Sequence, residues 1–442
     1  MQLPSRALGC HHSETRAEFN GGIQVPNVGS TIVSPTIPRA FFLVLAVQFL
    51  STIADNAFLI VAIARVIELD GAMWLVPFLK ISFILSYVVL APFVGPIADG
   101  FPKGRVMLAA NGLKVLAVGC LLAGVDPAIC IGLAGLGAAI YAPAKYGLVT
   151  ELIPAANLVR ANGYFEASTV SAVLLGTALG GFFVSPWMPI LHWHEGLSAA
   201  DGSQSLLIAG MLGLFLINLM ATLLSLAVAD TGARYRKHSI HPYALLRSFA
   251  RECGVLWRDR EGGLSMAVTT LLWAVGATLQ LVVLRWASEY LGLSLSQSAY
   301  LQGITAVGVI AGAVVASRCV AIDQAISLMP TGLAIGLLLP VMLVIHSVSG
   351  AALLMVVVGA LAGFFVVPMN ALLQHRGCTL LTAGRSIAVQ GFNENAGILA
   401  MLGVYAVATS LQISLAGLVW GFSGLVCLGM LFLLALRRHQ LQ

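Results

Sequence analysis

Residues 90–107 read LAPFVGPIADGFPKGRVM, an apolar run that ends in a short loop of glycine, proline and charged residues. The apolar run begins near residue 74, and another one starts at residue 105. A helix needs about 20 mostly apolar residues to cross the hydrocarbon core of a membrane, and both runs are long enough. This stretch therefore predicts two membrane-spanning helices that are joined by a tight charged turn.

The rest of the 442-residue chain repeats this pattern. Hydrophobic residues make up 59% of the sequence and charged residues only 9%, whereas soluble domains carry roughly 25% charged residues. Short strands of alternating polarity are absent, so helices are expected to span the membrane. We predict an all-α polytopic membrane protein with twelve transmembrane helices. The predicted helices are 40–66, 74–98, 105–124, 128–149, 165–190, 204–229, 264–290, 298–320, 325–347, 350–373, 384–410 and 411–436.

The longest polar stretch divides the chain into two halves of six helices each. The predicted regions are a disordered cytoplasmic tail at 1–38, a six-helix bundle at 39–229, a basic cytoplasmic loop at 230–263 and a second six-helix bundle at 264–442. Alternate loops are basic, as at Lys103 and Arg105, while the opposite loops hold Asp126, Glu195 and Glu289. Since cytoplasmic loops retain positive charge, both termini are predicted to be cytoplasmic.

The two halves contain related segments. In the first half, Pro143 and Lys145 precede the segment GYFE at 163–166. In the second half, Pro368 precedes the segment GFNE at 391–394 by a similar interval. Weak internal similarity of this kind is typical of a duplicated six-helix unit, as in the major facilitator fold.

The loop after residue 94 resembles a signature of that superfamily, G-x-x-x-D followed by G-R, and its matching residues are Gly95, Asp99, Gly104 and Arg105. Gly95 permits a close helix approach, and Asp99 can bond to the N-terminal dipole of a neighbouring helix. Arg105 is expected to pair across a cytoplasmic gate. We therefore predict a gating role for these four residues. The alternative is an ordinary charged turn that maintains topology.

Several segments of the chain resemble the bacterial lysophospholipid transporter family, LplT, of the major facilitator superfamily. They include QFLSTIADNAFL (48–59), AAIYAPAKYGLVTEL (138–152), GFFVVPMNALLQHRG (363–377) and GRSIAVQGFNENA (384–396). The similarity extends from about residue 40 to the C-terminus. It implies an inner-membrane carrier that moves lysophosphatidylethanolamine-type lipids to the cytoplasmic leaflet. There, an acyltransferase/acyl-carrier-protein synthetase partner would restore the missing chain. No cofactor, metal ion or nucleic acid is expected.

A carrier of such a lipid needs a cation for the phosphate, a carboxylate for the amine and an apolar opening for the tail. Polar residues inside membrane spans mark substrate pathways, and those of this chain form the predicted substrate site: Asp55, Asn56, Lys80, Lys114, Lys145, Arg285, Glu394 and Asn395. Asp55 and Glu394 resemble family positions in the first and eleventh helices. The alternative for Asp55 is an ion pair with Lys80 or Lys114 that only orders the first half. For Glu166, near a helix start, stabilisation of the helix dipole is favoured.

The seventh helix departs from the family pattern. The family places an arginine two residues after a threonine, where this chain has Gln280 after Thr278. Arg285 follows five residues later, a rotation of roughly 140 degrees, so it lies on another face of the helix. Arg285 either supplies the phosphate cation from nearer the outer mouth or extends toward the periplasm.

Two other functions fit a polytopic helical protein. A drug or metabolite exporter of the same fold is disfavoured because the fifth helix lacks the Gly-Pro pair of antiporters. A lipid-modifying membrane enzyme needs a histidine and an aspartate placed for general-base work. The nine histidines of this chain show no such arrangement, so we predict a transporter and not an enzyme.

Overall fold

The computed structural model describes residues 37–70, 74–185, 199–233, 235 and 241–439, and all regular elements in these ranges are helical. The α-helices are α1 (Arg39–Glu68), α2 (Leu75–Gly100), α3 (Lys103–Leu122), α4 (Pro127–Leu152), α5 (Leu158–Phe183), α6 (Ala199–Ser225), α7 (Pro242–Arg258), α8 (Arg260–Leu291), α9 (Leu295–Cys319), α10 (Met329–Leu338), α11 (Val348–Leu380), α12 (Ala383–Ser410) and α13 (Leu415–His439). Short 3-10 helices lie at Ala155–Asn157, Ile322–Leu328 and Leu339–Val344.

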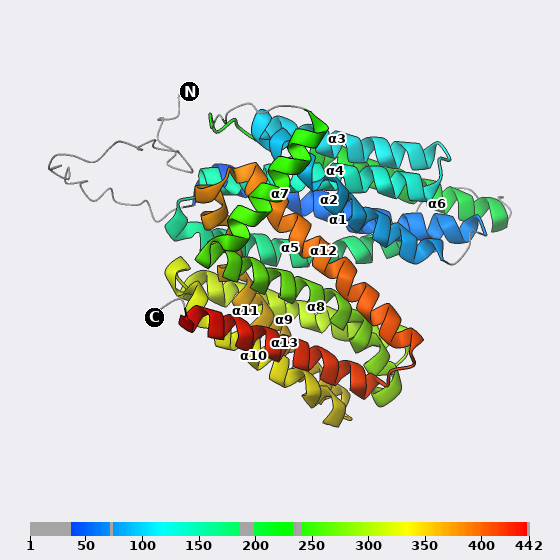
Figure 1. Cartoon of the computed structure of the whole chain (residues 1–442). Coiled ribbons are helices and arrows are strands. Elements are labelled where there is room, and N and C mark those ends of the chain that lie inside the picture. The colour runs from blue at the N-terminus through cyan, green and yellow to red at the C-terminus, as the bar shows by residue number, and fades with distance from the viewer. Residues whose placement is uncertain (1–36, 71–73, 186–198, 234, 236–240, 440–442) are drawn as a thin grey trace.

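The helices form two bundles that lie side by side, with α1–α6 in one and α8–α13 in the other (Figure 1). Eleven helical segments of the described chain are long and apolar enough to cross a membrane. The 28-residue helix α12 packs between α2, α4 and α8, and it carries charged and amide side chains such as Arg385, Gln390 and Glu394. The predicted fold class, an all-α polytopic membrane protein with two six-helix bundles, is confirmed.

Helix α7 was not predicted. It lies inside the stretch 230–263, whose polarity predicts a loop, and it crosses the outer face of the molecule near the junction of the bundles (Figure 1). Its buried residues, Leu245, Phe249, Glu252 and Leu256, recur at helical spacing. Helix α7 contains both apolar and basic residues, so its average polarity resembles that of a loop. The apolar residues nevertheless recur with the period of a helix.

The predicted helix boundaries differ most at α5. This helix begins at Leu158, seven residues before the predicted start at 165, and so includes the segment GYFE. Glu166 therefore lies in the third turn, is buried, and is too far from the helix start to stabilise its dipole. The prediction of a dipole role for Glu166 is wrong. Residues 1–36 of the predicted tail, as well as 234 and 236–240 of the loop, lie outside the described residues.

Small residues bring paired helices into close contact within each bundle. In the first bundle, a Cβ at Gly176 would meet the carbonyl oxygen of Ile53 at 2.5 Å. In the second bundle, a Cβ at Gly363 would clash with the carbonyl oxygen of Val309. Membrane helices associate through such close packing because lipid provides no hydrophobic drive. The contacts fix α1 against α5 and α9 against α11, and thereby hold the inward-facing polar residues in place.

Candidate functional site

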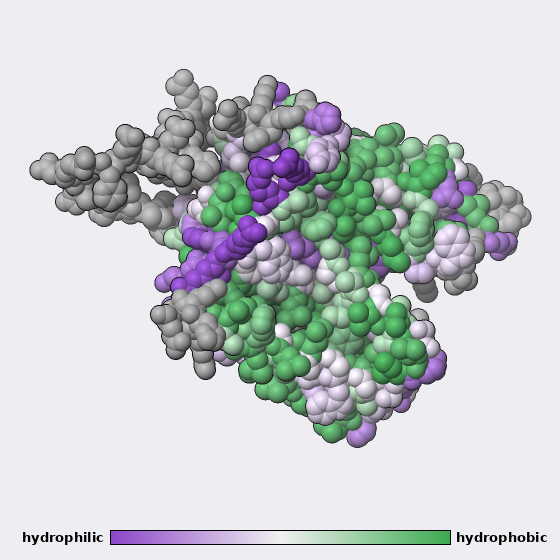
Figure 2. Space-filling view, in the orientation of Figure 1, coloured by the Kyte–Doolittle hydropathy of each residue, from purple (hydrophilic) through white to green (hydrophobic). Residues whose placement is uncertain are grey.

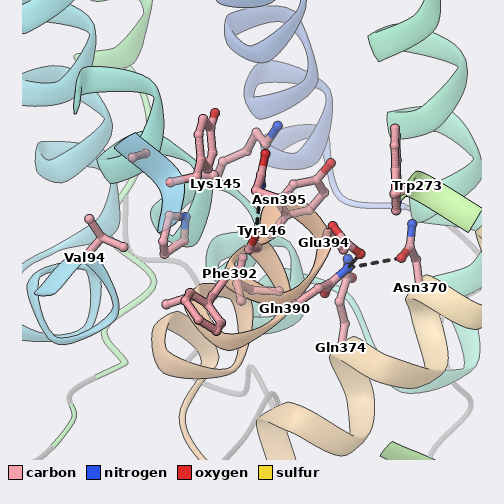
Figure 3. A pocket seen from close by; sticks show the side chains of 17 residues that line it. Val94, Lys145, Tyr146, Trp273, Asn370, Gln374, Gln390, Phe392, Glu394 and Asn395 are labelled. Atoms are coloured by element: carbon pink, nitrogen blue, oxygen red, sulfur yellow. Dashed lines mark hydrogen bonds between the residues drawn. The ribbon is translucent and has the colours of Figure 1, made fainter. Parts of the chain in front are cut away.

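A cavity of about 190 Å³ lies between the two bundles. Its lining comes from α2, α4, α8, α11 and α12, so both halves of the chain contribute (Figure 3). The polar and aromatic side chains around it include Tyr87, Lys145, Tyr146, Trp273, Gln390 and Glu394. Of the predicted substrate residues, the structure brings Lys145, Glu394 and Asn395 together at this cavity.

Lys145 extends from α4 two residues after Pro143, a proline inside the helix. Its side chain is 8% exposed, and its ammonium lies 4.2 Å from the ring centre of Tyr146. The rings of Tyr141 and Phe165 are each 5.7 Å away. Aromatic faces attract a cation but do not neutralise it, and Lys145 makes no ion pair within the described chain. It can therefore bind an anion that enters the cavity.

Glu394 supplies the negative charge on the opposite side of the cavity, from α12. One carboxylate oxygen accepts a hydrogen bond from Gln390 Nε2 at 2.9 Å. Gln390 Nε2 also donates to Asn370 Oδ1 of α11 at 3.1 Å (Figure 3). Asn395 donates from Nδ2 to the carbonyl oxygen of Gly391. No cation of the described chain pairs with Glu394, so its carboxylate can accept a cationic group of a ligand.

Two buried polar atoms of cavity-lining residues lack hydrogen-bond partners in the described chain: Trp273 Nε1 and Gln390 Oε1. Buried polar atoms are nearly always paired in proteins, with protein groups, water or a ligand. This donor and this acceptor beside one cavity are therefore available to water or to a polar ligand.

Asp55 and Lys114 lie outside this cavity lining and bind each other. The Lys114 ammonium is 2.6 Å from Asp55 Oδ2 and donates to Ser51 Oγ at 2.9 Å. Lys114 is 2% exposed, and the Asp55 side chain is 18% exposed. Asn56 donates to the carbonyl oxygen of Thr52. The structure thus shows the Asp55–Lys114 ion pair, which is the predicted alternative to headgroup binding.

Lys80 and Arg285 are remote from the cavity lining. Lys80 is exposed on the second turn of α2. Arg285 lies near the end of α8, where its Nε is 2.6 Å from Oε1 of Glu289, and both side chains are partly exposed. Neither residue lines the cavity. Gln280, where the sequence resemblance leads us to expect an arginine, accepts a hydrogen bond at its backbone carbonyl oxygen from Gln302 Nε2.

The predicted gating residue Asp99 joins the two halves at the α2–α3 loop. Its carboxylate accepts hydrogen bonds from the backbone N–H groups of Gly384 (2.9 Å) and Arg385 (3.2 Å), at the first turn of α12. It also accepts one from the hydroxyl of Thr382. A carboxylate satisfies the free N–H groups and the positive dipole of a helix start. Gly95 permits this approach, since a Cβ there would meet Arg385 Cα at 2.9 Å.

Lys103 makes the ionic contacts near Asp99, and Arg105 does not. The Lys103 ammonium lies 3.4 Å from Asp99 Oδ1 and 2.6 Å from Glu151 Oε1. Tyr235 donates to the same Glu151 carboxylate, and burial there raises the pKa of Tyr235. Arg105 is exposed and has no ion pair within the described ranges, although a pairing across the gate was expected. Gly104 packs closely on Val228.

Three further contacts lie at this end of the molecule. Asn162 of α5 and Gln374 of α11 exchange reciprocal side-chain hydrogen bonds of 2.9 and 3.0 Å. Arg385 pairs with Glu252 of α7. At the boundary of α7 and α8, Arg376 binds Asp259 through two hydrogen bonds, which hold the pKa of that carboxyl below its usual value.

At the opposite end of the molecule, the described residues of the two lobes are parted. Figure 2 shows a notch between the two lobes at the end away from the termini. In the part of the chain that is described, the side-chain hydrogen bonds between the halves all involve the α2–α3 end. The molecule is thus closed at the α2–α3 loop and parted at the other end.

Sequence reasoning missed several cavity residues. Asn370 and Gln374 lie within the quoted segment PMNALLQ, and their amides in an apolar helix were the available signal. Tyr146 directly follows Lys145. For Trp273 no signal exists, because an indole in a membrane helix is most often part of the packing or the interface.

Two parted helical bundles around a charged cavity define a major facilitator transporter. The sequence profile of the Major Facilitator Superfamily matches residues 40–400. Solved structures agree on the fold: the fucose:proton symporter FucP (N162A) of E. coli has a TM-score of 0.69 at 12% identity and covers 90% of this chain and 98% of its own. An outward-facing bacterial homologue of the iron transporter ferroportin has a TM-score of 0.66 at 15% identity, covering 91% of this chain and all of its own.

Curated relatives narrow the class. The lysophospholipid transporter LplT of Yersinia enterocolitica is 38% identical over 380 residues, covering 86% of this chain and 89% of its own. The lysophospholipid transporter LplT of Yersinia pestis is 40% identical over 380 residues, covering 85% of this chain and 88% of its own. The chain belongs to the lysophospholipid transporter family, LplT, as the sequence resemblance indicated. These relatives are named as transporters, in agreement with the prediction that this chain is not an enzyme.

Proposed function

We propose that this protein transports lysophospholipids across a bacterial inner membrane by alternating access, and delivers them to the cytoplasmic leaflet for re-acylation. Family membership supports the substrate class. The observation that carries the proposal is the cavity between the halves, where Lys145 has no carboxylate partner and Glu394 no cation partner in the described chain. A lysophosphatidylethanolamine headgroup carries both of the complementary charges.

The headgroup fits the cavity by charge. Its phosphate binds Lys145, and the unpaired N–H of Trp273 donates to a phosphate oxygen. Its ammonium binds Glu394, and the amides of Gln390 and Asn395 contact the glycerol hydroxyl. Hydrogen bonds to charged groups are stronger than neutral ones, so these contacts select a headgroup of both charges.

The acyl chain stays outside this cavity. A volume of about 190 Å³ is below the roughly 300–1,000 Å³ of sites that enclose drug-sized ligands. An acyl chain gains nothing by leaving the hydrocarbon, because lipid is as apolar as any protein pocket. The headgroup therefore crosses between the halves while the chain remains in lipid.

The direction of transport is the one that the resemblance to the lysophospholipid transporter family implies, and the charge distribution supports the orientation of the protein in the membrane. Basic residues gather at the α2–α3 end, among them Lys103, Arg105 and Arg318, whereas Asp126 and Glu289 lie at the other end, before α4 and in the last turn of α8. By the positive-inside rule, the α2–α3 end and both termini are cytoplasmic. The described conformation is then closed to the cytoplasm and open outward, and Asp99, Gly95 and Gly104 act in the cytoplasmic gate.

Re-acylation requires an acyltransferase/acyl-carrier-protein synthetase at the cytoplasmic face. The basic segment between α6 and α7 is our proposed docking site for this partner, because it carries Arg234, Arg236 and Lys237. Reversal of these three charges is expected to weaken co-purification of the partner, and unchanged co-purification would contradict the docking site.

The test of transport is uptake of radiolabelled lysophosphatidylethanolamine into spheroplasts that lack their own transporter. Wild-type protein should support uptake, and Lys145→Gln/Glu394→Gln should lose it at equal expression. Arg318→Gln, an exposed cation outside the cavity, is the matched control and should retain it. Absence of uptake by well-expressed wild-type protein would contradict the substrate. Uptake by the double variant at the wild-type rate would contradict the site alone.

A further inference from the structure

Helix α7 has one buried face and two exposed faces. Neither exposed face has a role in the transport proposed above. The buried face packs on α2, α8 and α12 and includes Phe249, whose ring lies 5.3 Å from that of Phe392. A second face carries Tyr243, Leu246 and Trp257, which are 70%, 49% and 43% exposed. Large apolar side chains on a basic amphipathic helix are typical of helices that lie in a membrane interface.

The third face of α7 is basic. Arg247, Arg251 and Arg258 recur at intervals of four and seven residues, which places them within about 40 degrees of one another on the helix. All three are exposed, and none makes an ion pair within the described chain. Figure 2 shows hydrophilic side chains along α7 beside the apolar surface of the bundles. This row of unneutralised charge is complementary to anionic headgroups.

An apolar groove begins at the end of α7. It has a volume of about 330 Å³ and is lined by Thr270, Ala274, Gly397, Met401, Val404 and Leu425, with Trp257 also contributing to it. Trp257 Nε1 donates to Asn393 Oδ1 of α12 at 3.0 Å, which fixes the indole beside the groove. On α8 the groove extends from Ala267 to Ala274, roughly 10–21 Å from the first residue of that helix. If α8 enters the membrane near its first residue, the groove lies at the depth of the acyl chains, below the lipid headgroups.

We propose that α7 and this groove form a binding site for one anionic phospholipid of the surrounding leaflet. The phosphate and the negative headgroup bind Arg251 and Arg258, and one acyl chain lies in the groove between α8, α12 and α13. Charge decides the class of lipid: an unpaired row of arginines favours a headgroup with net negative charge over a zwitterionic one. The site is separate from the cavity that contains Lys145 and Glu394.

The site also touches the gate. Glu252, on the buried face of α7, pairs with Arg385 in the first turn of α12. The same first turn receives the carboxylate of Asp99. A lipid bound to α7 therefore stabilises the helix that holds α12 in the closed arrangement.

The test titrates purified full-length protein with dioleoyl phosphatidylglycerol or dioleoyl phosphatidylcholine and counts bound lipid by native mass spectrometry. Phosphatidylglycerol should bind more tightly. Arg251→Gln/Arg258→Gln should weaken its binding by roughly tenfold or more and leave phosphatidylcholine unchanged. Arg39→Gln/Arg318→Gln removes two exposed arginines elsewhere and should change neither affinity.

A second variant tests the groove. Ala400 is exposed and lines it, so Ala400→Trp fills the space without disturbing a buried position and should weaken the binding of both lipids. Equal affinities of wild-type protein for the two lipids would overturn the proposal. So would equal losses in the two arginine pairs. Displacement of phosphatidylglycerol by an equal concentration of lysophosphatidylethanolamine would assign the groove to the transported lipid instead.

Discussion

Two buried lysines of the first bundle, Lys114 and Lys145, occupy contrasting environments. Lys114 is bound by Asp55 at 2.6 Å and by Ser51, and its charge is neutralised. Lys145 is enclosed by three aromatic rings and has no ion pair in the described chain. Both are cations in membrane helices, which the sequence marks equally as functional. The contrast teaches that the partners of a buried charge, and not its burial, distinguish a ligand site from a structural pair.

The strongest test of this contrast is Asp55→Ala. Removal of one partner leaves Lys114 uncompensated at 2% exposure, and breaking a buried ion pair costs about 3–5 kcal/mol. We expect a lower melting temperature in detergent, little folded protein and no uptake. Asp55→Ala/Lys114→Ala removes both charges and should recover most of the stability. A stable Asp55→Ala protein without uptake would instead make Asp55 a headgroup ligand.

Lys145→Gln should show the opposite behaviour. No ion pair within the described chain is lost, so the melting temperature should stay near that of wild type. Loss of a charged hydrogen bond to the phosphate, worth about 1.5–3 kcal/mol, should reduce uptake at low substrate by roughly 10- to 150-fold. Lys145→Arg keeps the charge and should retain part of the activity. A large fall in melting temperature for Lys145→Gln would make Lys145 structural, like Lys114.

Glu394→Gln sharpens the comparison within the cavity. The variant retains an acceptor for Gln390 Nε2 but loses the charge for an ammonium group. Uptake of lysophosphatidylethanolamine should fall about tenfold, while uptake of lysophosphatidylglycerol, which lacks the amine, should be unaffected. Competition between the two lipids measures the change in preference. Equal losses for both lipids would exclude a headgroup-selective role.

Asp99→Ala should have the smallest effect on binding. It removes the cap of α12, a loss of about 1 kcal/mol, and it weakens the closed end without touching the cavity. Turnover should slow, while the affinity for lysophospholipid, measured by ligand-induced thermal stabilisation, stays within a few-fold of wild type. An equal loss of affinity and turnover would argue against a gating role.

The sequence was sufficient for the fold because the membrane leaves few choices. Backbone groups in hydrocarbon must be satisfied internally, so long apolar runs become helices. Helix α7 was not predicted because it lies outside the membrane-spanning segments and is amphipathic instead of apolar throughout. The predicted start of α5 is too late because the polar residues before it, together with Glu166, look like a loop in the sequence. In the structure Glu166 is buried inside the bundle.

The site could be predicted only in part. The pattern of apolar runs marks Lys145 and Glu394 as unusual, and the resemblance directs attention to α12. Which charged side chains form ion pairs depends on the helix faces that carry them. These faces are known only once the helices are packed into the bundle. Lys114 pairs with Asp55, and Lys103 pairs with Asp99 and Glu151 of its own half, whereas Arg105 makes no pair across the gate within the described chain. Trp273 lines the cavity without any mark in sequence. Each of these placements depends on how the helix is rotated about its own axis. The positions at which helices begin and end do not define that rotation.

Helix α12 holds both the capped first turn at Gly384 and the cavity residue Glu394. The ten residues between them form a rigid arm of about 15 Å. A tilt of roughly 10 degrees about Glu394 would move the first turn by about 2.6 Å, and the 2.9 Å bond to Asp99 does not survive such a displacement. If the headgroup binds at Glu394 as proposed, a small change in the angle of α12 at that residue is enough to break the contact of its first turn with Asp99.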